Sequence, residues 1–250
     1  MKIAVLVKQV PDTETKIAPK ADKSGIEEAG VKFIMNPYDE NAVEEAIKLG
    51  GESTVIGMGP DRVVESLRTA LAMGIAKAVH IDTAGKNFDA FSSATVLAAA
   101  IKEGGYDLVI CGKQAIDNDN SQTVQMVAEL IGAAQVMNVE KLEIAGDKAK
   151  ITRRTSAGKE IYESGFPLVI GADKALNTPR YASLPGIMKA KTKPIDKKTA
   201  DALLGGATAL VAFSNYQLPP ERAAGKKIDG EPAAQAAQLV KLLREEAKVI

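Results

Sequence analysis

The feature that most constrains the fold of this chain is an alternation of short, almost entirely apolar segments with stretches of helical periodicity. The apolar segments are rich in Val and Ile and cover residues 2–7, 54–58, 78–81, 107–111 and 167–172. Strands that are apolar at nearly every position are typical of a parallel sheet that is covered by helices on both faces. The alternation therefore predicts a doubly wound α/β fold with a mostly parallel sheet.

Three helices have recognisable sequence signals. The first, over residues 37–49, follows Asn36, an N-cap candidate, and has Pro37 at its first position. The second covers residues 60–73 and also begins with a proline. At the end of the chain, residues 233–250 repeat apolar side chains at helical spacing, which predicts a third, amphipathic helix.

Two segments depart from the alternation. Residues 139–164 predict short antiparallel strands, which would extend the sheet at its edge as a hairpin. Residues 177–194 contain three prolines and predict an irregular segment. We expect an α/β domain over residues 1–190 that includes an exposed loop at about 172–194, followed by a C-terminal extension over residues 191–250.

The composition argues against several classes of protein. Lys plus Arg and Asp plus Glu each number 32, so the chain lacks the basic field that nucleic-acid binding requires. The single cysteine, Cys111, excludes an internal disulfide and favours a reducing compartment. The one histidine, His80, is interpreted as a strand-end residue, and no metal-ligand spacing is present. No apolar run is long enough for a membrane span or a signal peptide, so we expect a cytoplasmic protein of bacterial or archaeal type without membrane insertion.

The loops that leave the carboxyl ends of the expected strands are candidates for a ligand site, because open α/β sheets bind ligands there. They cover residues 7–12, 57–60 and 112–123. A helix that begins near Ser121 would direct backbone N–H groups and its positive dipole end at a phosphate. The Asp and Asn side chains at 117–120 can hydrogen-bond a ribose or an adenine. The alternative is a solvated turn with a helix cap. Neither the GxGxxG nor the GxxxxGK[ST] motif is present, so the residues alone leave both open.

Five stretches spread along the chain resemble one family, the small (beta) subunit of electron transfer flavoprotein. They are VKQVPDT (7–13), NPYDENAVEEA (36–46), GPDRVVESLRTALAMG (59–74), GKQAIDNDNSQT (112–123) and NTPRYASLPGIMKAK (177–191). The resemblance implies a Rossmann-like fold of the adenine-nucleotide-binding type and an electron carrier rather than an enzyme. It implies a heterodimer with a larger alpha subunit, with FAD bound between the two. Such a carrier accepts electrons from acyl-CoA or related dehydrogenases, as in fatty acid beta-oxidation, and passes them to a quinone oxidoreductase.

The resemblance further implies that this subunit binds a structural AMP. By matching position, the expected contacts are Leu6, Asn36, Pro37, Tyr38, Asp39, Met58, Gly112, Lys113, Gln114, Ala115, Ile116, Asp117, Asn118, Asp119, Asn120, Ser121, Gln122 and Thr123. It implies no catalytic residue and no metal ligand in this chain.

The segment 177–191 resembles the recognition loop of the family, in which an exposed leucine enters an apolar pocket of the partner dehydrogenase. Leu184 matches that leucine, and the alternative is that it packs on its own domain. The expected partner-binding residues, which include a basic rim of one arginine and two lysines, are Arg180, Tyr181, Leu184, Pro185, Ile187, Met188, Lys189 and Lys191. The C-terminal helix is expected to contact either the alpha subunit or its own core.

Two other interpretations stay open. Pro11 and Thr13 resemble a bifurcating branch of the family, which holds a second FAD in place of AMP and oxidises NADH, whereas the stretches 36–46 and 112–123 resemble the branch that contains AMP. Val124 replaces a glycine that is common in relatives that bind AMP. From another class, a stand-alone regulatory protein that binds an adenine nucleotide could use the same sheet.

Overall fold

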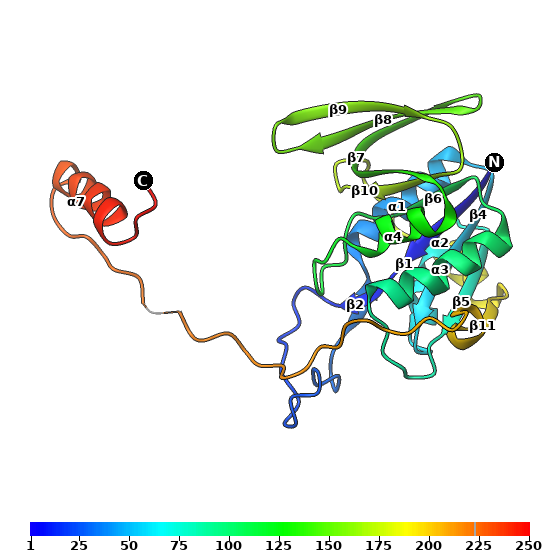
Figure 1. Ribbon diagram of the computed structural model, residues 1–250, viewed down its shortest axis with the longest axis horizontal. Coiled ribbons are helices and arrows are strands. Elements are labelled where there is room, and N and C mark those ends of the chain that lie inside the picture. Colours follow the sequence, from blue (N-terminus) through cyan, green and yellow to red (C-terminus); the bar gives the residue numbers. More distant parts are fainter. Residues whose placement is uncertain (223) are drawn as a thin grey trace.

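The structure, a computed structural model, describes residues 1–222 and 224–250. A nine-stranded sheet forms its centre, with the order β11-β5-β4-β1-β6-β10-β7-β8-β9 (Figure 1). Its strands are β1 (Lys2–Val7), β4 (Glu52–Gly59), β5 (Lys77–Asp82), β6 (Leu108–Gly112), β7 (Ala134–Ala145), β8 (Lys148–Thr155), β9 (Gly158–Ser164), β10 (Leu168–Ala172) and β11 (Asp196–Thr199). All pairs from β11 to β7 are parallel, and β8 and β9 add an antiparallel edge hairpin. The predicted fold class is therefore confirmed.

Burial on both faces explains the apolar runs of the sequence. Every residue of β6 and of β10 is buried. Along β1, Ile3 and Val5 face one hydrophobic cluster, while Ala4 and Leu6 face a second cluster on the opposite side of the sheet. Successive strand residues point to opposite faces, so a sheet covered on both faces requires apolar side chains at each position.

Helices cover the two faces of this sheet. The first face carries α1 (Pro37–Leu49), α2 (Val63–Met73) and α5 (Leu184–Thr192), whose buried apolar residues belong to the first cluster. The second face carries α3 (Ala90–Gly104), α4 (Thr123–Ile131) and α6 (Ala200–Leu203). A separate two-stranded hairpin is formed by β2 (Gln9–Pro11) and β3 (Phe33–Met35).

Some elements differ from the sequence expectations. The predicted helix over 60–73 begins only at Val63, because residues 60–62 form a turn. Within the segment predicted to be irregular, α5 forms because the Ser183 side chain accepts a hydrogen bond from the N–H of Gly186 and a proline occupies the first turn. His80 is fully buried within β5, and its Nε2 lies 3.0 Å from the carbonyl oxygen of Gly59.

The C-terminal arm, defined as residues 204–222 and 224–250, leaves the α/β domain and ends in α7 (Pro232–Glu245), which lies away from the sheet (Figure 1). The backbone N–H groups of Leu210 and Val211 donate to the carboxylate of Asp89, and this contact holds the start of the arm. None of the described residues of α7 is buried. Its apolar stripe is therefore left uncovered by the α/β domain.

Candidate nucleotide site and partner surfaces

The strand order reverses at β1. From β1 the chain continues to β4 and β5 on one side, whereas β6, β10 and β7 lie on the other side (Figure 1). The ends of β1 and β6 lie side by side, with Leu6 paired in register with Cys111. In open α/β sheets such a switch point creates a crevice at the carboxyl ends of the strands. We call this region, with the loops that follow β1, β4 and β6, the carboxyl edge.

Asp39 joins three elements at the carboxyl edge. Its carboxylate accepts hydrogen bonds from the backbone N–H of Lys8, at 2.8 Å, and from that of Gly112, at 2.9 Å. Burial raises the pKa of Asp39 to about 7, although the two N–H donors act in the opposite direction. The side chain therefore fixes the start of α1 to the ends of β1 and β6.

Asn36 holds the loop that follows β6. Its side-chain amide donates to the carbonyl oxygen of Gln114, at 2.9 Å, and its amide oxygen accepts from the N–H of Ile116, at 3.2 Å. Asn36 is the N-cap residue of α1, as predicted, but its side chain makes no cap hydrogen bond among the described residues and binds the loop instead. The backbone carbonyl of Asn36 still accepts the first hydrogen bond of the helix, from Asp39.

The 113–122 loop is polar and locally ordered. Asp117 forms an ion pair with Lys8, at 2.6 Å, and the side chain of Gln114 donates to Asp119, at 2.6 Å. Asp119 and Ser121 both adopt left-handed backbone conformations, with φ of 51° and 49°. Such conformations in residues other than glycine cost free energy and are concentrated at functional loops.

The first turn of α4 is available for an anion. No side chain caps this helix among the described residues, so its first N–H groups and the positive end of its dipole face the loop. Gln125, in the same turn, has a buried side-chain oxygen without a hydrogen-bond partner in the described parts of the chain; this oxygen is an acceptor and does not itself bind an anion. Val124 is buried in the second hydrophobic cluster, which accounts for an apolar residue at that position. A phosphate at this helix start would meet donors that are otherwise unpaired.

All of the sequence-predicted nucleotide residues lie at the carboxyl edge, but they divide by role. Leu6, Asn36, Asp39 and Gly112 are buried, and the side chains of Asn36 and Asp39 hold the neighbouring backbone by hydrogen bonds. Residues 117–120 are exposed, although the carboxylates of Asp117 and Asp119 already bind Lys8 and Gln114. The ammonium group of Lys113 forms an ion pair with Asp173, at 2.9 Å, and lies 5.0 Å from the centre of the Tyr38 ring. Because Asp173 already neutralises it, Lys113 is not positioned to bind a phosphate. Met58 lies at the end of β4 and is half-buried.

The segment before α5 is anchored to α1 by buried polar groups that the sequence analysis missed. The side chain of Asn177 donates to the carboxylate of Glu45, at 2.8 Å, and to the backbone of Asn41, at 3.0 Å. The guanidinium of Arg180 binds Glu44 with two hydrogen bonds of 2.8 and 2.9 Å. Polar residues on adjoining turns of a helix normally indicate a solvated face, so their burial could not be read from the spacing.

Close packing then fixes α5 on α2. A Cβ atom on Gly186 would lie 2.5 Å from the carbonyl oxygen of Ala72, which shows how closely the two helices approach. The guanidinium of Arg68, in α2, donates to the carbonyl oxygens of Ala190 and Lys193. On this rigid base the segment presents large apolar side chains to solvent; their exposed fractions are 99% for Tyr181, 73% for Leu184, 40% for Ile187 and 58% for Met188.

Arg180 differs from the other two members of the expected basic rim. Its guanidinium is engaged by Glu44, whose side chain is buried, whereas Lys189 and Lys191 are exposed in the last turn of α5. Arg180 therefore acts within the chain as an anchor of the segment. Pro185 takes part in the first turn of the helix and limits its alternative conformations.

The described residues contain neither a metal-ligand cluster nor a candidate membrane span. No group of three or more His, Cys, Asp or Glu side chains there is arranged to hold a metal ion. No helix in the same residues is long and apolar enough to cross a membrane.

The chain is similar to known proteins over its whole length. Residues 24–203 match the model of the electron transfer flavoprotein domain. The chain is 41% identical to the electron transfer flavoprotein subunit beta of Bradyrhizobium diazoefficiens over 255 residues and 41% identical to that of Bacillus subtilis over 259 residues, with full coverage of all three chains. It is 40% identical to the subunit beta of Mus musculus over 237 residues, which cover 92% of this chain and 93% of the relative. The chain therefore belongs to the family of electron transfer flavoprotein beta subunits.

Proposed function

We propose that this chain binds AMP as a structural cofactor at the carboxyl edge and works as an electron carrier subunit together with an alpha subunit that shares an FAD. The observation that carries the AMP proposal is the uncapped start of α4 behind a loop that Asn36 holds in place. The N–H groups from Ser121 to Thr123 would bind the phosphate. The side chains of residues 117–120 would hydrogen-bond the ribose or the adenine.

The residues of the carboxyl edge support a structural role for this nucleotide. Asp39, whose pKa burial raises to about 7, accepts two backbone hydrogen bonds, so its carboxyl group is engaged in holding α1 to the ends of β1 and β6. Cys111 is buried, and burial raises the pKa of its thiol well above the ordinary value, so it is a poor nucleophile. Redox chemistry would be supplied by the flavin, and this chain would help to bind it and to position its partners.

The C-terminal arm is the proposed contact with the alpha subunit. Large exposed apolar side chains that lack cover from the α/β domain mark protein interaction sites. On the described residues of the arm they are Leu210, Val211, Phe213, Tyr216, Leu218, Leu239, Val240, Val249 and Ile250. An arm that ends in a separate helix can reach around a second subunit.

The segment 177–192 is the proposed docking site for the dehydrogenase that donates electrons. Leu184 would enter an apolar pocket of the partner, and Lys189 and Lys191 would steer an acidic surface toward it. Acyl-CoA or related dehydrogenases are the proposed donors, and a quinone oxidoreductase is the proposed acceptor. The neutral composition and the single cysteine agree with a cytoplasmic carrier.

The AMP proposal is tested by placing a charge at the start of α4. Ser121→Asp adds a carboxylate beside the proposed phosphate, and aspartate tolerates the left-handed conformation of Ser121. A carboxylate at a helix N-terminus stabilises the helix itself, so a loss of nucleotide would not reflect unfolding. Ser121→Asn is the matched control, because asparagine has nearly the same shape as aspartate but carries no charge.

The measurement is the AMP released per mole of denatured protein, together with the melting temperature. We expect Ser121→Asp to lose about tenfold or more of its affinity for AMP, a change of about 1.4 kcal/mol, while Ser121→Asn keeps AMP. Equal AMP content in both variants would contradict a phosphate at this helix start.

A further inference from the structure

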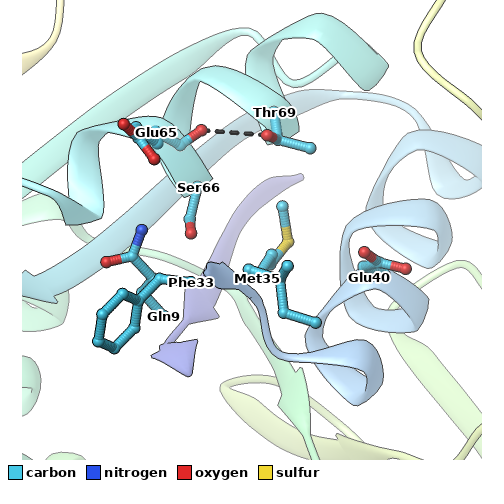
Figure 2. Close-up of a pocket in the computed structure, with 8 residues that line it drawn as sticks. Gln9, Phe33, Met35, Glu40, Glu65, Ser66 and Thr69 are labelled. Carbon is cyan, nitrogen blue, oxygen red and sulfur yellow. Dashed lines mark hydrogen bonds between the residues drawn. The ribbon is translucent and has the colours of Figure 1, made fainter. Parts of the chain in front are cut away.

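A pocket lies outside the carboxyl edge. It has a volume of about 220 Å³ and lies between α1, α2 and the β2–β3 hairpin (Figure 2). Its polar lining includes Gln9, Glu40, Glu65 and Ser66, and Phe33 and Met35 supply part of an apolar wall. None of these residues belongs to the proposed AMP contacts, although Gln9 and Glu40 directly follow Lys8 and Asp39 in the sequence.

Two buried oxygen atoms of this pocket lack hydrogen-bond partners in the described parts of the chain. Gln9 is 9% exposed; its side-chain nitrogen donates to the carbonyl oxygen of Arg62, at 2.9 Å, while its Oε1 is unpaired. Ser66 is 3% exposed, and its Oγ is also unpaired. Figure 2 shows the hydroxyl of Ser66 directed from α2 into the space above Gln9 and Met35. Unpaired buried oxygens are costly, so a bound group that donates hydrogen bonds would stabilise them.

The charged side chains that line the pocket, Glu40 and Glu65, are both acidic, and no cation neutralises them in the described residues. In the described residues, neither Glu40 nor Glu65 has a cation within ion-pair distance. Burial raises the pKa of Glu40, because its carboxylate loses hydration without gaining a partner. A cation at the margin, Arg62, is paired through Nη2 with Glu28, at 3.3 Å, and lies 4.1 Å from the ring centre of Phe33, while its Nε has no hydrogen-bond partner in the described residues.

The hydrogen-bonding groups of the pocket are almost all acceptors. Gln9 offers an amide oxygen, and the carboxylates offer only acceptor atoms. The hydroxyl of Thr69 donates to the backbone carbonyl of Glu65, so its remaining capacity is to accept. Ser66 alone among these side chains retains a free O–H in the described structure. A ligand that matches this set must be rich in donors and positively charged.

We propose that this pocket binds an alkylguanidinium or alkylammonium group. The cation lies between Glu40, Ser66 and the side-chain oxygen of Gln9, and its methylene stem packs along Phe33 and Met35. Long cationic side chains and aliphatic amines combine an apolar stem with a charged head in this way. The cation can be a free small molecule or an Arg or Lys side chain of a bound protein.

The direct test is a titration of the full chain with n-butylguanidinium chloride, followed by NMR of backbone and side-chain amides. We expect shifts at the side-chain amide of Gln9 and at the backbone of Ser66, with saturation at millimolar concentration. Sodium butyrate has a similar stem and the opposite charge, and we expect it to cause no shift at these positions.

Two variants test whether the cation binds in this pocket. Glu40→Gln retains the shape of the side chain and removes its charge, and we expect it to weaken binding by about tenfold. Glu163→Gln is the matched control, because Glu163 is exposed on β9 and lies outside the pocket. Absence of saturable shifts in the unmodified chain, or equal binding by both variants, would overturn the proposal.

Repeating the titration on the purified complex with the alpha subunit distinguishes the two sources of the cation. If the complex still binds n-butylguanidinium, the pocket serves a free amine or guanidine. If the complex excludes it and Glu40→Gln weakens assembly, a side chain of the partner fills the pocket. Both results require that the isolated chain binds n-butylguanidinium. This binding does not depend on AMP, so the pocket proposal can fail or hold independently of the AMP proposal.

Discussion

The carboxylate of Asp39 accepts a hydrogen bond of 2.9 Å from the backbone N–H of Gly112 and thereby ties the first turn of α1 to the end of β6. The same carboxylate binds the N–H of Lys8, at the end of β1. The geometry of the switch point thus depends on one buried acid. Changes to either partner should alter the whole carboxyl edge.

A side chain at position 112 should disturb this contact. A Cβ atom on Gly112 would lie 2.4 Å from the carboxylate of Asp39 and 2.8 Å from the backbone of Tyr38. We expect Gly112→Ala to lower the free energy of unfolding by roughly 2 kcal/mol, as overpacking commonly does, and to reduce AMP content. Urea denaturation measures the first effect. Gly25→Ala is the control, because a Cβ atom there meets nothing within 4 Å; equal stability of the two variants would contradict the close approach.

The raised pKa of Asp39 predicts a pH dependence of stability. Because its pKa in the folded chain, about 7, lies above the ordinary value of 3.8, the folded state holds its proton more tightly. This contribution to stability is complete below about pH 4 and falls as the pH rises toward 7, by at most about 1.4 kcal/mol per pH unit. Urea denaturation of the unmodified chain and of Asp39→Asn, which imitates the protonated acid, measures the difference at each pH.

The expected result is that the free energy of unfolding of the unmodified chain falls relative to that of Asp39→Asn between about pH 4 and pH 7, and that the difference is constant above that range. A constant difference would show that Asp39 does not titrate in this range. If the variant does not fold, the carboxyl carbon of Asp39 can be followed by NMR in the unmodified chain, where a midpoint near its ordinary value would contradict the account.

Loss of Arg180 should destabilise the segment that precedes α5. Its guanidinium lowers the pKa of Glu44, and Glu44 would remain as a buried charge without a partner. We expect Arg180→Gln to cost roughly 2 kcal/mol, less than a fully buried pair because the arginine side chain is partly exposed. The double variant Arg180→Gln with Glu44→Gln should recover part of the loss in thermal denaturation. A loss in the double variant that equals or exceeds the sum of the losses in Arg180→Gln and Glu44→Gln would argue against the pair.

Leu184 should matter for docking and not for folding. Its side chain is 73% exposed, so Leu184→Ala should change the free energy of unfolding by less than about 0.5 kcal/mol. We expect the rate of flavin reduction by an acyl-CoA dehydrogenase to fall about tenfold or more, as at an interface hot spot. Ile161→Ala removes another exposed side chain on the edge hairpin and serves as the control. Equal rates for the two variants would remove Leu184 from the docking surface.

The core strands could be predicted because burial on two faces leaves a simple sequence signal. β6 and β10 are apolar at almost every position, and the edge hairpin has clear turns. β11 could not be found in this way, because its sequence, DKKT, joins the sheet through backbone pairing with β5 and leaves its charged side chains in water. The helix α3 was not predicted, although Asp89 and Ser92 form a capping box that could have indicated its start.

The sequence predicted where in the fold the candidate site lies, but not which contacts its side chains make. Parallel strands bring their carboxyl ends to one edge, so the loop at 113–122 and the start of α1 had to meet there. The direction of individual side chains could not be foreseen. Asn36 has the sequence signature of a helix cap, yet its amide binds the loop, and Arg180 was expected to face a partner but binds Glu44. Both depend on contacts between residues that lie far apart in the sequence.

The most direct test of the central claim is the cofactor content of the heterodimer. The chain would be expressed together with its alpha subunit, and the released AMP and FAD would be quantified after the purified complex is denatured. Our account predicts one AMP and one FAD per heterodimer. Two FAD and no AMP would contradict it, and would indicate instead the bifurcating arrangement in which NADH is oxidised at a flavin in this subunit.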